Sequence, residues 1–219
     1  IDYIYHLADL NGNARWLAQN NYTQFNANTQ CLSILLNLII KYHCDAKLIC
    51  LGSAWAYPSN KSIVEEKDFG NMPLIKGLES YAKAKIYQFD LLNFAAKEKN
   101  LNFSFFPVCT IFGDTDNSDH LIPSLLKRIS AKPKSLDIYT DGNELRNFLH
   151  VDDLANALYL FRDCSYKIMN ISNNKRTSIK NIVDLITKNL SYEGEVKYSS
   201  VKGLNTPELS VQRSELKYS

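Results

Sequence analysis

A doubly wound α/β fold with a parallel sheet is predicted by two observations. Two apolar runs of strand length, LICLG at 48–52 and FSFFPV at 103–108, are almost unbroken. Runs of this kind are typical of parallel sheets, whose strands are buried on both faces. The segments between and after them have the apolar periodicity of helices. Strands that alternate with helices indicate a Rossmann-type arrangement, in which helices cover both faces of the sheet.

The individual elements follow from apolar periodicity and from the turn residues that bound each segment. The chain opens on a strand-like IDYIYHLA at 1–8 without a cap or linker before it, so we expect an N-terminal part of the fold to be missing. The expected strands are Tyr3–Leu7, Lys47–Gly52, Asn102–Val108 and Leu136–Tyr139. The expected helices are Asn28–Tyr42, Ser80–Lys97, Ile122–Ser130, Val151–Arg162 and Ser178–Asn189.

Two regions are expected along the chain. Residues 1–113 contain the long strands and helices, and they predict a partial dinucleotide-binding domain of the Rossmann type. After residue 113 the predicted helices are shorter and the loops are longer and more polar. Residues 114–219 therefore predict mainly a small substrate-binding lobe, with segments that return to the first domain.

Composition and charge exclude several classes of protein. The chain has 219 residues, of which 45% are hydrophobic and 22% are charged, as in a soluble globular protein with a sizeable core. Its net charge is +2 and its basic residues are scattered, so neither a nucleic acid nor a membrane surface is expected as a partner. The longest apolar run, SILLNLII at 33–40, is too short to span a bilayer.

The cysteines indicate a reducing environment. They are odd in number and far apart in the sequence, and no pair has the spacing of metal ligands. We therefore expect free thiols, no metal site and a cytoplasmic protein. The five cysteines are Cys31, Cys44, Cys50, Cys109 and Cys164.

Small and polar residues follow three of the predicted strands, in the segments HLADLNGN, GSAWAYPSN and CTIFGDTDN. Parallel sheets bind ligands at the carboxyl ends of their strands, so these segments are expected to line a crevice. Ser53 comes directly after the second strand, which places its hydroxyl at this edge.

A tyrosine and a lysine lie one turn apart on a predicted helix, as Tyr81 and Lys85, and therefore share a face. An ammonium near a phenol favours the phenolate, so we expect Lys85 to lower the pKa of Tyr81. Together with Ser53, these groups are able to exchange a proton with a substrate oxygen and to stabilise its charge.

These residues and several longer motifs resemble one enzyme family. Ser53 with Tyr81-x-x-x-Lys85 resembles the catalytic triad of the extended short-chain dehydrogenase/reductases. DYIYHLA at 2–8, PVCTIFG at 107–113 and, most specifically, GNELRNFLHVDDLANAL at 142–158 resemble motifs of the NAD-dependent epimerase/dehydratase family, which acts on nucleotide sugars. The resemblance implies a nicotinamide cofactor, bound by Leu7, Ala8, Ser53, Tyr81, Lys85 and Pro107.

Within the family, YPSNKSIVEE at 57–66 and DNSDHLIPSLLKRI at 116–129 are most similar to the GDP-L-fucose synthases, which are NADPH-dependent epimerases and 4-ketoreductases. This similarity implies NADP in preference to NAD, and a GDP-sugar as substrate. It also implies His120 as a second acid/base, and two arginines on the substrate diphosphate. The implied substrate-binding residues are Trp55, Thr110, Arg128, Tyr139 and Arg146.

Three departures from the synthase pattern limit what the resemblance implies. Trp55 stands where the synthases have a cysteine, and an indole cannot carry a proton in epimerisation. Thr110 stands where an asparagine is usual. The sequence also has no Gly-x-x-Gly-x-x-Gly loop, which in this fold binds the cofactor pyrophosphate.

The expected function is reduction, with or without epimerisation, of a nucleotide-linked 4-keto-deoxy sugar. Two alternatives stay open: a nucleotide-sugar 4-epimerase with tightly bound NAD, and a non-catalytic relative that acts as a binding or scaffold protein. Net consumption of NADPH separates the reductase from the epimerase. The resemblance further implies a homodimer formed through the helices at 28–42 and 80–97.

Overall fold

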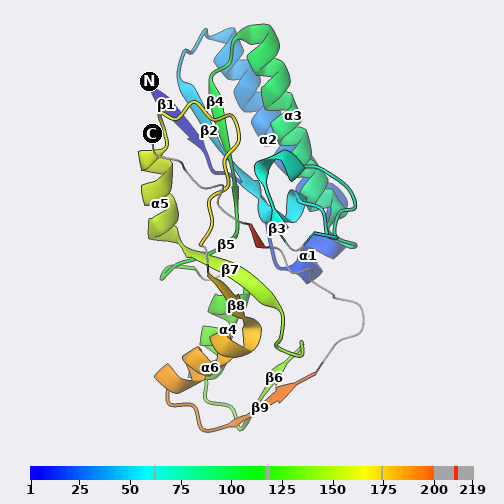
Figure 1. Cartoon of the computed structure of the whole chain (residues 1–219), viewed down its shortest axis with the longest axis vertical. Helices are drawn as coiled ribbons and strands as arrows, with labels where there is room; N and C mark the ends of the chain where they lie inside the picture. Colours follow the sequence, from blue (N-terminus) through cyan, green and yellow to red (C-terminus); the bar gives the residue numbers. More distant parts are fainter. Residues whose placement is uncertain (62, 117–118, 174, 200–209, 212–219) are drawn as a thin grey trace.

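The structure is a computed structural model of the chain, and it describes residues 1–61, 63–116, 119–173, 175–199 and 210–211. Figure 1 shows an elongated molecule in which an upper unit, which contains the N-terminus, is followed along the long axis by a smaller lower unit.

The upper unit is built on a parallel sheet. Its strands are β1 (Tyr3–His6), β2 (Lys47–Ser53) and β4 (Phe103–Val108), in the order β1-β2-β4. On the other edge of β4, single parallel bridges join Phe105 to Ile168 and Val108 to Ile171. The carboxyl ends of all these strands point toward the lower unit (Figure 1).

Helices cover both faces of this sheet. Helices α2 (Asn21–Lys41) and α3 (Glu79–Lys99) lie side by side on one face, and α5 (Val151–Leu160) lies on the other (Figure 1). The alternation of side chains along β2 explains both layers. Leu48 and Cys50 belong to the core under α2 and α3, whereas Ile49 belongs to the core under α5. This arrangement confirms the predicted doubly wound α/β fold.

The lower unit combines short strands with two helices. Strands β5 (Thr110–Phe112), β7 (Leu145–His150) and β8 (Arg176–Ser178) form one sheet, in which β5 and β7 are parallel and β8 is antiparallel to β7. Strands β6 (Ser135–Ile138) and β9 (Glu195–Tyr198) form a parallel pair. Helices α4 (Leu121–Ser130) and α6 (Ile179–Asn189) share a core with these strands. The expected domain boundary at residue 113 stays a prediction, and residues 200–209 and 212–219 lie outside the described residues.

The predicted long elements are present with small shifts at their ends, but helix α2 begins at Asn21 instead of Asn28. Its first turns bury polar side chains, those of Gln24, Asn28 and Thr29, against the neighbouring segments. Apolar periodicity could not reveal a helix face of this kind.

Several short elements were not predicted, because segments of two to six residues carry little periodicity. They include β5, β7, β8 and β9 of the lower unit. The others are α1 (Ala14–Gln19), β3 (Ile63–Val64), β10 (Ser210–Val211) and the 3₁₀ turns Ala54–Ala56 and Glu66–Asp68.

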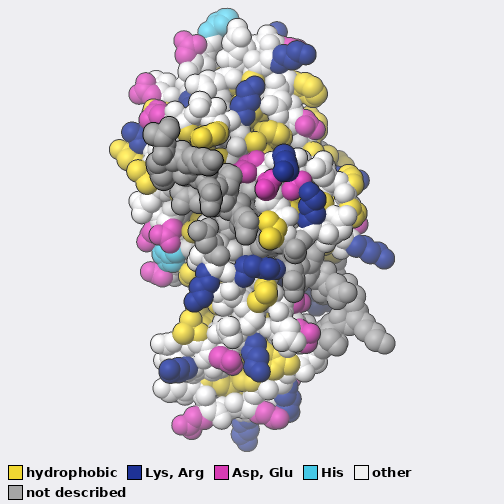
Figure 2. All heavy atoms as spheres, viewed as in Figure 1, with side chains coloured by type: hydrophobic (Ala, Val, Ile, Leu, Met, Phe, Trp, Pro, Cys, Tyr) yellow, Lys and Arg dark blue, Asp and Glu magenta, His cyan; other side chains and the backbone are white. Residues whose placement is uncertain are grey.

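The surface agrees with the scattered charges of the sequence. On the face shown in Figure 2, acidic and basic side chains are interspersed over both units. Within the described parts of the chain, no helix is long and apolar enough to cross a bilayer.

Gly52 allows β2 to pass close to β4 just before Ser53. A Cβ atom at Gly52 would lie 2.5 Å from Phe105 Cε1 and 3.1 Å from the Pro107 Cα. Because both neighbours belong to a buried strand, we expect Gly52→Ala to lower the free energy of unfolding by about 2 kcal/mol, as in other overpacked cores. Chemical denaturation measures this, with Thr23→Ala at an exposed position of α2 as the control. Equal midpoints for Gly52→Ala and the unchanged protein would contradict the close approach.

Candidate active site

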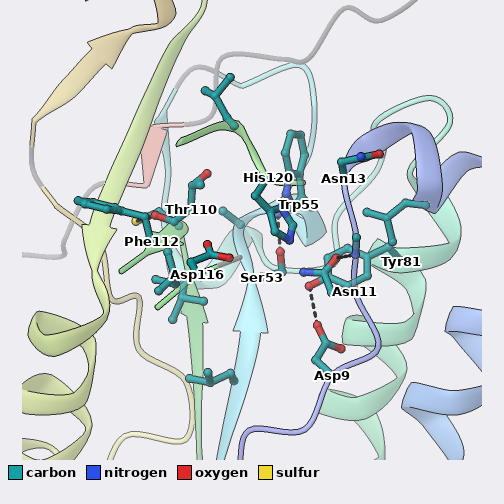
Figure 3. A pocket seen from close by; sticks show the side chains of 18 of the residues that line it. Asp9, Asn11, Asn13, Ser53, Trp55, Tyr81, Thr110, Phe112, Asp116 and His120 are labelled. Atoms are coloured by element: carbon teal, nitrogen blue, oxygen red, sulfur yellow. Dashed lines mark hydrogen bonds between the residues drawn. The ribbon is translucent and has the colours of Figure 1, made fainter. Parts of the chain in front are cut away.

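A cavity of about 750 Å³ lies where the carboxyl ends of the parallel strands meet the lower unit. Open α/β sheets bind ligands at this edge, and the volume is in the range of small-molecule sites. The wall comes from the loop after β1, the turn after β2, one face of α3 and the segment between β4 and α4 (Figure 3).

Ser53 ends β2 and is buried in the cavity wall. Its Oγ accepts a hydrogen bond of 3.2 Å from the backbone N–H of Trp55, and it thereby caps the 3₁₀ turn that follows the strand. This bond uses the oxygen as an acceptor, so the hydroxyl hydrogen remains available to a further acceptor.

Tyr81 and Lys85 are buried on the face of α3 that turns toward the cavity, as their spacing predicted. A third residue joins them. The Tyr81 hydroxyl donates a hydrogen bond of 2.9 Å to Asp9 Oδ2, and Lys85 Nζ lies 3.0 Å from Asp9 Oδ1. Lys85 also donates to the carbonyl of Leu51, at 3.3 Å. Asp9 thus contacts both members of the predicted pair, and Figure 3 shows its contact with Tyr81.

The prediction that Lys85 lowers the pKa of Tyr81 is wrong for this structure. Burial of the phenol raises the pKa of Tyr81 well above its ordinary value, and the charge of Asp9 and its hydrogen bond raise that pKa further. A hydrogen bond with Ser53 lowers the same pKa, but by less. The physical reasons are that the phenol is buried and that the carboxylate of Asp9 lies against the ammonium and offsets its positive charge.

The loop that carries Asp9 is held by a buried amide. Asn28 on α2 accepts a hydrogen bond of 2.7 Å from the N–H of Leu10 and donates one of 3.1 Å to the Leu10 carbonyl. Gln88 on α3 donates to the backbone carbonyl of Asn28 at 2.9 Å. These bonds connect the loop to both helices, and they fix the backbone next to Asp9.

Sequence reasoning missed Asp9 and Asn28. The only sign of Asp9 was its place just after a strand, in a segment that was expected to line the crevice. Asn28 was taken as the start of a helix, and its burial reveals itself only in the packed structure.

Most of the other predicted site residues also lie in the cavity wall. Arg146, on β7, places its guanidinium 5.9 Å from the ring centroid of Trp55, and its Nη2 lies 3.1 Å from Glu144 Oε2. Arg146 and Trp55 therefore connect the lower unit to the turn after β2. The predicted residues that line the cavity are Leu7, Ala8, Ser53, Trp55, Tyr81, Lys85, Thr110, His120, Tyr139 and Arg146.

Two predicted residues are not brought to the cavity wall. Arg128, in the last turn of α4, donates to the backbone carbonyl of Asp137 and lies 5.9 Å from the ring centroid of Tyr139. Pro107 is buried within β4, where its carbonyl accepts a hydrogen bond of 2.9 Å from Ile171. Neither residue is among the described residues that line the cavity.

His6 is a further polar residue of the wall, at the end of β1. Its Nε2 is buried and has no hydrogen-bond partner among the described residues. Burial, followed by the positive charge of Lys85, lowers the pKa of His6, so its imidazole is neutral at pH 7. Within those residues no group of histidine, cysteine and carboxylate side chains has the arrangement of a metal site.

Comparison with known proteins agrees with this geometry. Residues 1–172 match the NAD dependent epimerase/dehydratase family. The chain belongs to this family. The resemblance found in the sequence is thus confirmed at the level of the family. Ser53, Tyr81 and Lys85, on which that resemblance was partly based, all line the cavity.

Individual family members are distant in sequence. The chain is 25% identical over 201 residues to probable GDP-L-fucose synthase 1 of Oryza sativa subsp. japonica, in an alignment that covers 87% of this chain and 61% of that protein. It therefore spans less than two thirds of that relative's length.

Two crystal structures show the same fold. One is a GDP-6-OMe-4-keto-L-xylo-heptose reductase from C. jejuni, with a TM-score of 0.85 and 18% identity over 96% of this chain and 75% of that chain. The other is UDP-glucose 4-epimerase from Thermotoga maritima, with a TM-score of 0.81 and 19% identity over 97% of this chain and 69% of that chain.

The buried contacts of Asn28 yield a test of the loop. Asn28→Ala leaves the N–H and the carbonyl of Leu10 without these partners, so we expect the free energy of unfolding to fall by about 2 to 3 kcal/mol. Asn37→Ala, at an exposed position of the same helix, is the matched control and should change it by less than about 0.5 kcal/mol. Similar losses in the two variants, measured by denaturant unfolding, would show that Asn28 does not hold the loop.

Proposed function

We propose that the protein is a nicotinamide-dependent reductase of a nucleotide-linked 4-keto-deoxy sugar. The observation that carries the proposal is the presence of Ser53, Tyr81 and Lys85 in the wall of one cavity at the carboxyl edge of a parallel sheet. An alcohol and a phenol beside an ammonium are able to bind and protonate a keto oxygen. Membership of the family supports the same chemistry.

The residues of the cavity fit the nicotinamide end of a dinucleotide. Lys85 offers a buried cationic donor for ribose hydroxyls, and the buried Nε2 of His6 offers a polar atom that its neighbours leave without a hydrogen bond. We propose that Leu7, Ala8 and Lys85 hold this end, and that NADP is preferred to NAD because of the similarity to GDP-L-fucose synthases. Pro107 is proposed to bind the cofactor on the ground of the family resemblance alone. When bound, the nicotinamide supplies the hydride for the keto carbon.

The proton for the keto oxygen comes from Tyr81. In the structure its hydroxyl donates to Asp9, and in the reaction it donates to the keto oxygen of the substrate instead. Ser53, whose Oγ already accepts from Trp55, donates its hydrogen to the same oxygen and stabilises the charge that develops there. Lys85 holds the cofactor ribose near these groups.

The remaining wall residues are proposed to bind the sugar nucleotide, for which a GDP-sugar is favoured. Arg146 is suited to a diphosphate, because a guanidinium binds phosphate oxygens in a bidentate manner. Trp55, Thr110 and Tyr139 would contact the sugar and the base. Arg128, whose guanidinium lies over the ring of Tyr139, would hold that ring in position against the substrate.

We favour reduction without epimerisation because Trp55 stands where the GDP-L-fucose synthases have a cysteine. An indole cannot carry out the proton transfers that epimerisation requires of that cysteine. His120 lines the cavity and is proposed as a second acid/base only where an epimerisation accompanies the reduction. All five cysteines are free thiols in the structure, and on this ground we propose a cytoplasmic protein.

We also propose a homodimer formed through α2 and α3. Both helices carry large apolar side chains that are exposed in the single chain, namely Ile34 and Leu38 on α2 and Tyr87 and Phe94 on α3. Exposed apolar side chains that gather on neighbouring helices are a feature of interfaces in soluble proteins. Two such helix pairs can pack as a four-helix interface.

Tyr81→Phe tests the catalytic assignment. Because the variant has no proton to give, we expect turnover of a GDP-4-keto-6-deoxy sugar, followed as NADPH consumption, to fall about 10²- to 10⁴-fold. Tyr166→Phe, which removes a hydroxyl from an exposed tyrosine outside the proposed interface, should retain normal turnover. Nearly normal turnover by Tyr81→Phe would contradict the role of Tyr81 as the proton donor. Sugar conversion without NADPH consumption would indicate an epimerase.

Ile34→Lys tests the homodimer. A lysine in the apolar face of α2 would be buried without a partner at the interface, so we expect sedimentation velocity to show a monomer where the unchanged protein is a dimer. Leu185→Lys replaces an exposed leucine of α6, outside the proposed interface, and should leave the dimer intact. A monomeric unchanged protein, or a dimer that survives Ile34→Lys, contradicts this interface.

A further inference from the structure

Among the described residues, Asp9 is the carboxylate that contacts both Tyr81 and Lys85. Its two oxygens lie 2.9 Å from the Tyr81 hydroxyl and 3.0 Å from the Lys85 ammonium, respectively. The side chain of Lys85 is 4% exposed and that of Asp9 is 19% exposed, so water screens this ion pair little. The carboxylate contributes to the site as a fixed negative charge.

The position of Asp9 is determined by the backbone beside it. Asn28 binds both polar backbone groups of Leu10, and Asn28 is itself bonded to Gln88 on α3. The helix that carries Tyr81 and Lys85 is therefore also tied to the loop that carries Asp9. The contact is part of a buried network and does not depend on a mobile surface side chain.

Few other polar groups face the phenol. Ser53 hydrogen-bonds to it from the end of β2, and the Lys85 ammonium lies 5.8 Å from the ring centroid on the same helix. His6 on β1 interacts with the charges of both Lys85 and Asp9, and it is neutral at pH 7. Asp9 is the negative charge that acts most strongly on Tyr81.

We propose that Asp9 is a positioning residue for the reduction of a keto group: it holds the Tyr81 hydroxyl as a proton donor and keeps that tyrosine protonated beside the Lys85 ammonium. This inference rests on the proposed function and adds the group that sets the protonation state of Tyr81. Family resemblance had assigned a role to Tyr81 and Lys85 but none to Asp9.

The proton balance of the reduction ends on Tyr81. The O–H bond of Tyr81 breaks and its proton forms the new O–H bond on the sugar, while a bound reduced nicotinamide would supply the hydride. The phenolate left behind lies beside the Asp9 carboxylate, and this repulsion favours its return to the phenol by uptake of a proton from water, which restores the proton donor.

The first test measures the ionisation of Tyr81 directly, in the whole protein without substrate. Tyrosine labelled with ¹³C at Cζ is titrated by NMR, and Tyr81→Phe identifies the resonance of Tyr81. In Asp9→Asn we expect this resonance to titrate at least about one pH unit lower, a tenfold change in the ionisation constant. Asp90→Asn, at an exposed carboxylate of the same helix, should leave it unchanged.

An unchanged titration of Tyr81 in Asp9→Asn overturns the proposal. Asp9→Ser, which removes the charge with a smaller side chain, is a second variant with the same expected shift. Thermal unfolding of both variants establishes that they are folded under the titration conditions.

The second test measures the pH dependence of the reduction. In Asp9→Asn the reduction rate should fall, as Tyr81 loses its proton, at a pH at least about one unit lower than in the unchanged protein, and an unchanged profile also overturns the proposal. Absence of turnover by the unchanged protein contradicts the proposed function, whereas the coupling between Asp9 and Tyr81 is decided by the titration alone. The two failures are therefore distinguishable.

Discussion

A buried ammonium is the constraint around which the cavity is arranged. Removal of the Lys85 charge from water costs several kcal/mol unless partners take the place of water. The carboxylate of Asp9 and the carbonyl of Leu51 are those partners. Since one follows β1 and the other belongs to β2, pairing with Lys85 holds α3 against the edge of the sheet, and Tyr81 is held with it.

The sequence allowed prediction of the parts that depend on local pattern. The runs LICLG and FSFFPV became the buried strands β2 and β4, and the spacing of Tyr81 and Lys85 placed both on one face of α3. Asp9 could not be found in this way, because it lies 72 positions from Tyr81 and the contact exists only after the sheet has formed. Burial of the phenol, followed by that contact, raises the pKa of Tyr81, so its shift was predicted with the wrong sign.

Arg128 and Arg146 show that a matched motif does not determine which partners a side chain has in the structure. The resemblance assigned both Arg128 and Arg146 to the substrate diphosphate. Arg128 lies in the last turn of α4, where its guanidinium reaches the carbonyl of Asp137, whereas Arg146 extends from β7 to the ring of Trp55 in the cavity wall. The same residue type at two matched positions therefore has different partners, and only the packing of the lower unit distinguishes them.

The path of the chain between the two units has a consequence for how such proteins diverge. The chain leaves the upper unit after β4, returns to it with α5 and residues 168–171, leaves again for β8, and comes back with β10, which pairs with β3. With these repeated crossings, neither unit is a contiguous segment that recombination could exchange for another. New preferences must then arise by point substitutions along the shared wall, which makes residues such as Trp55 the natural places for relatives to differ.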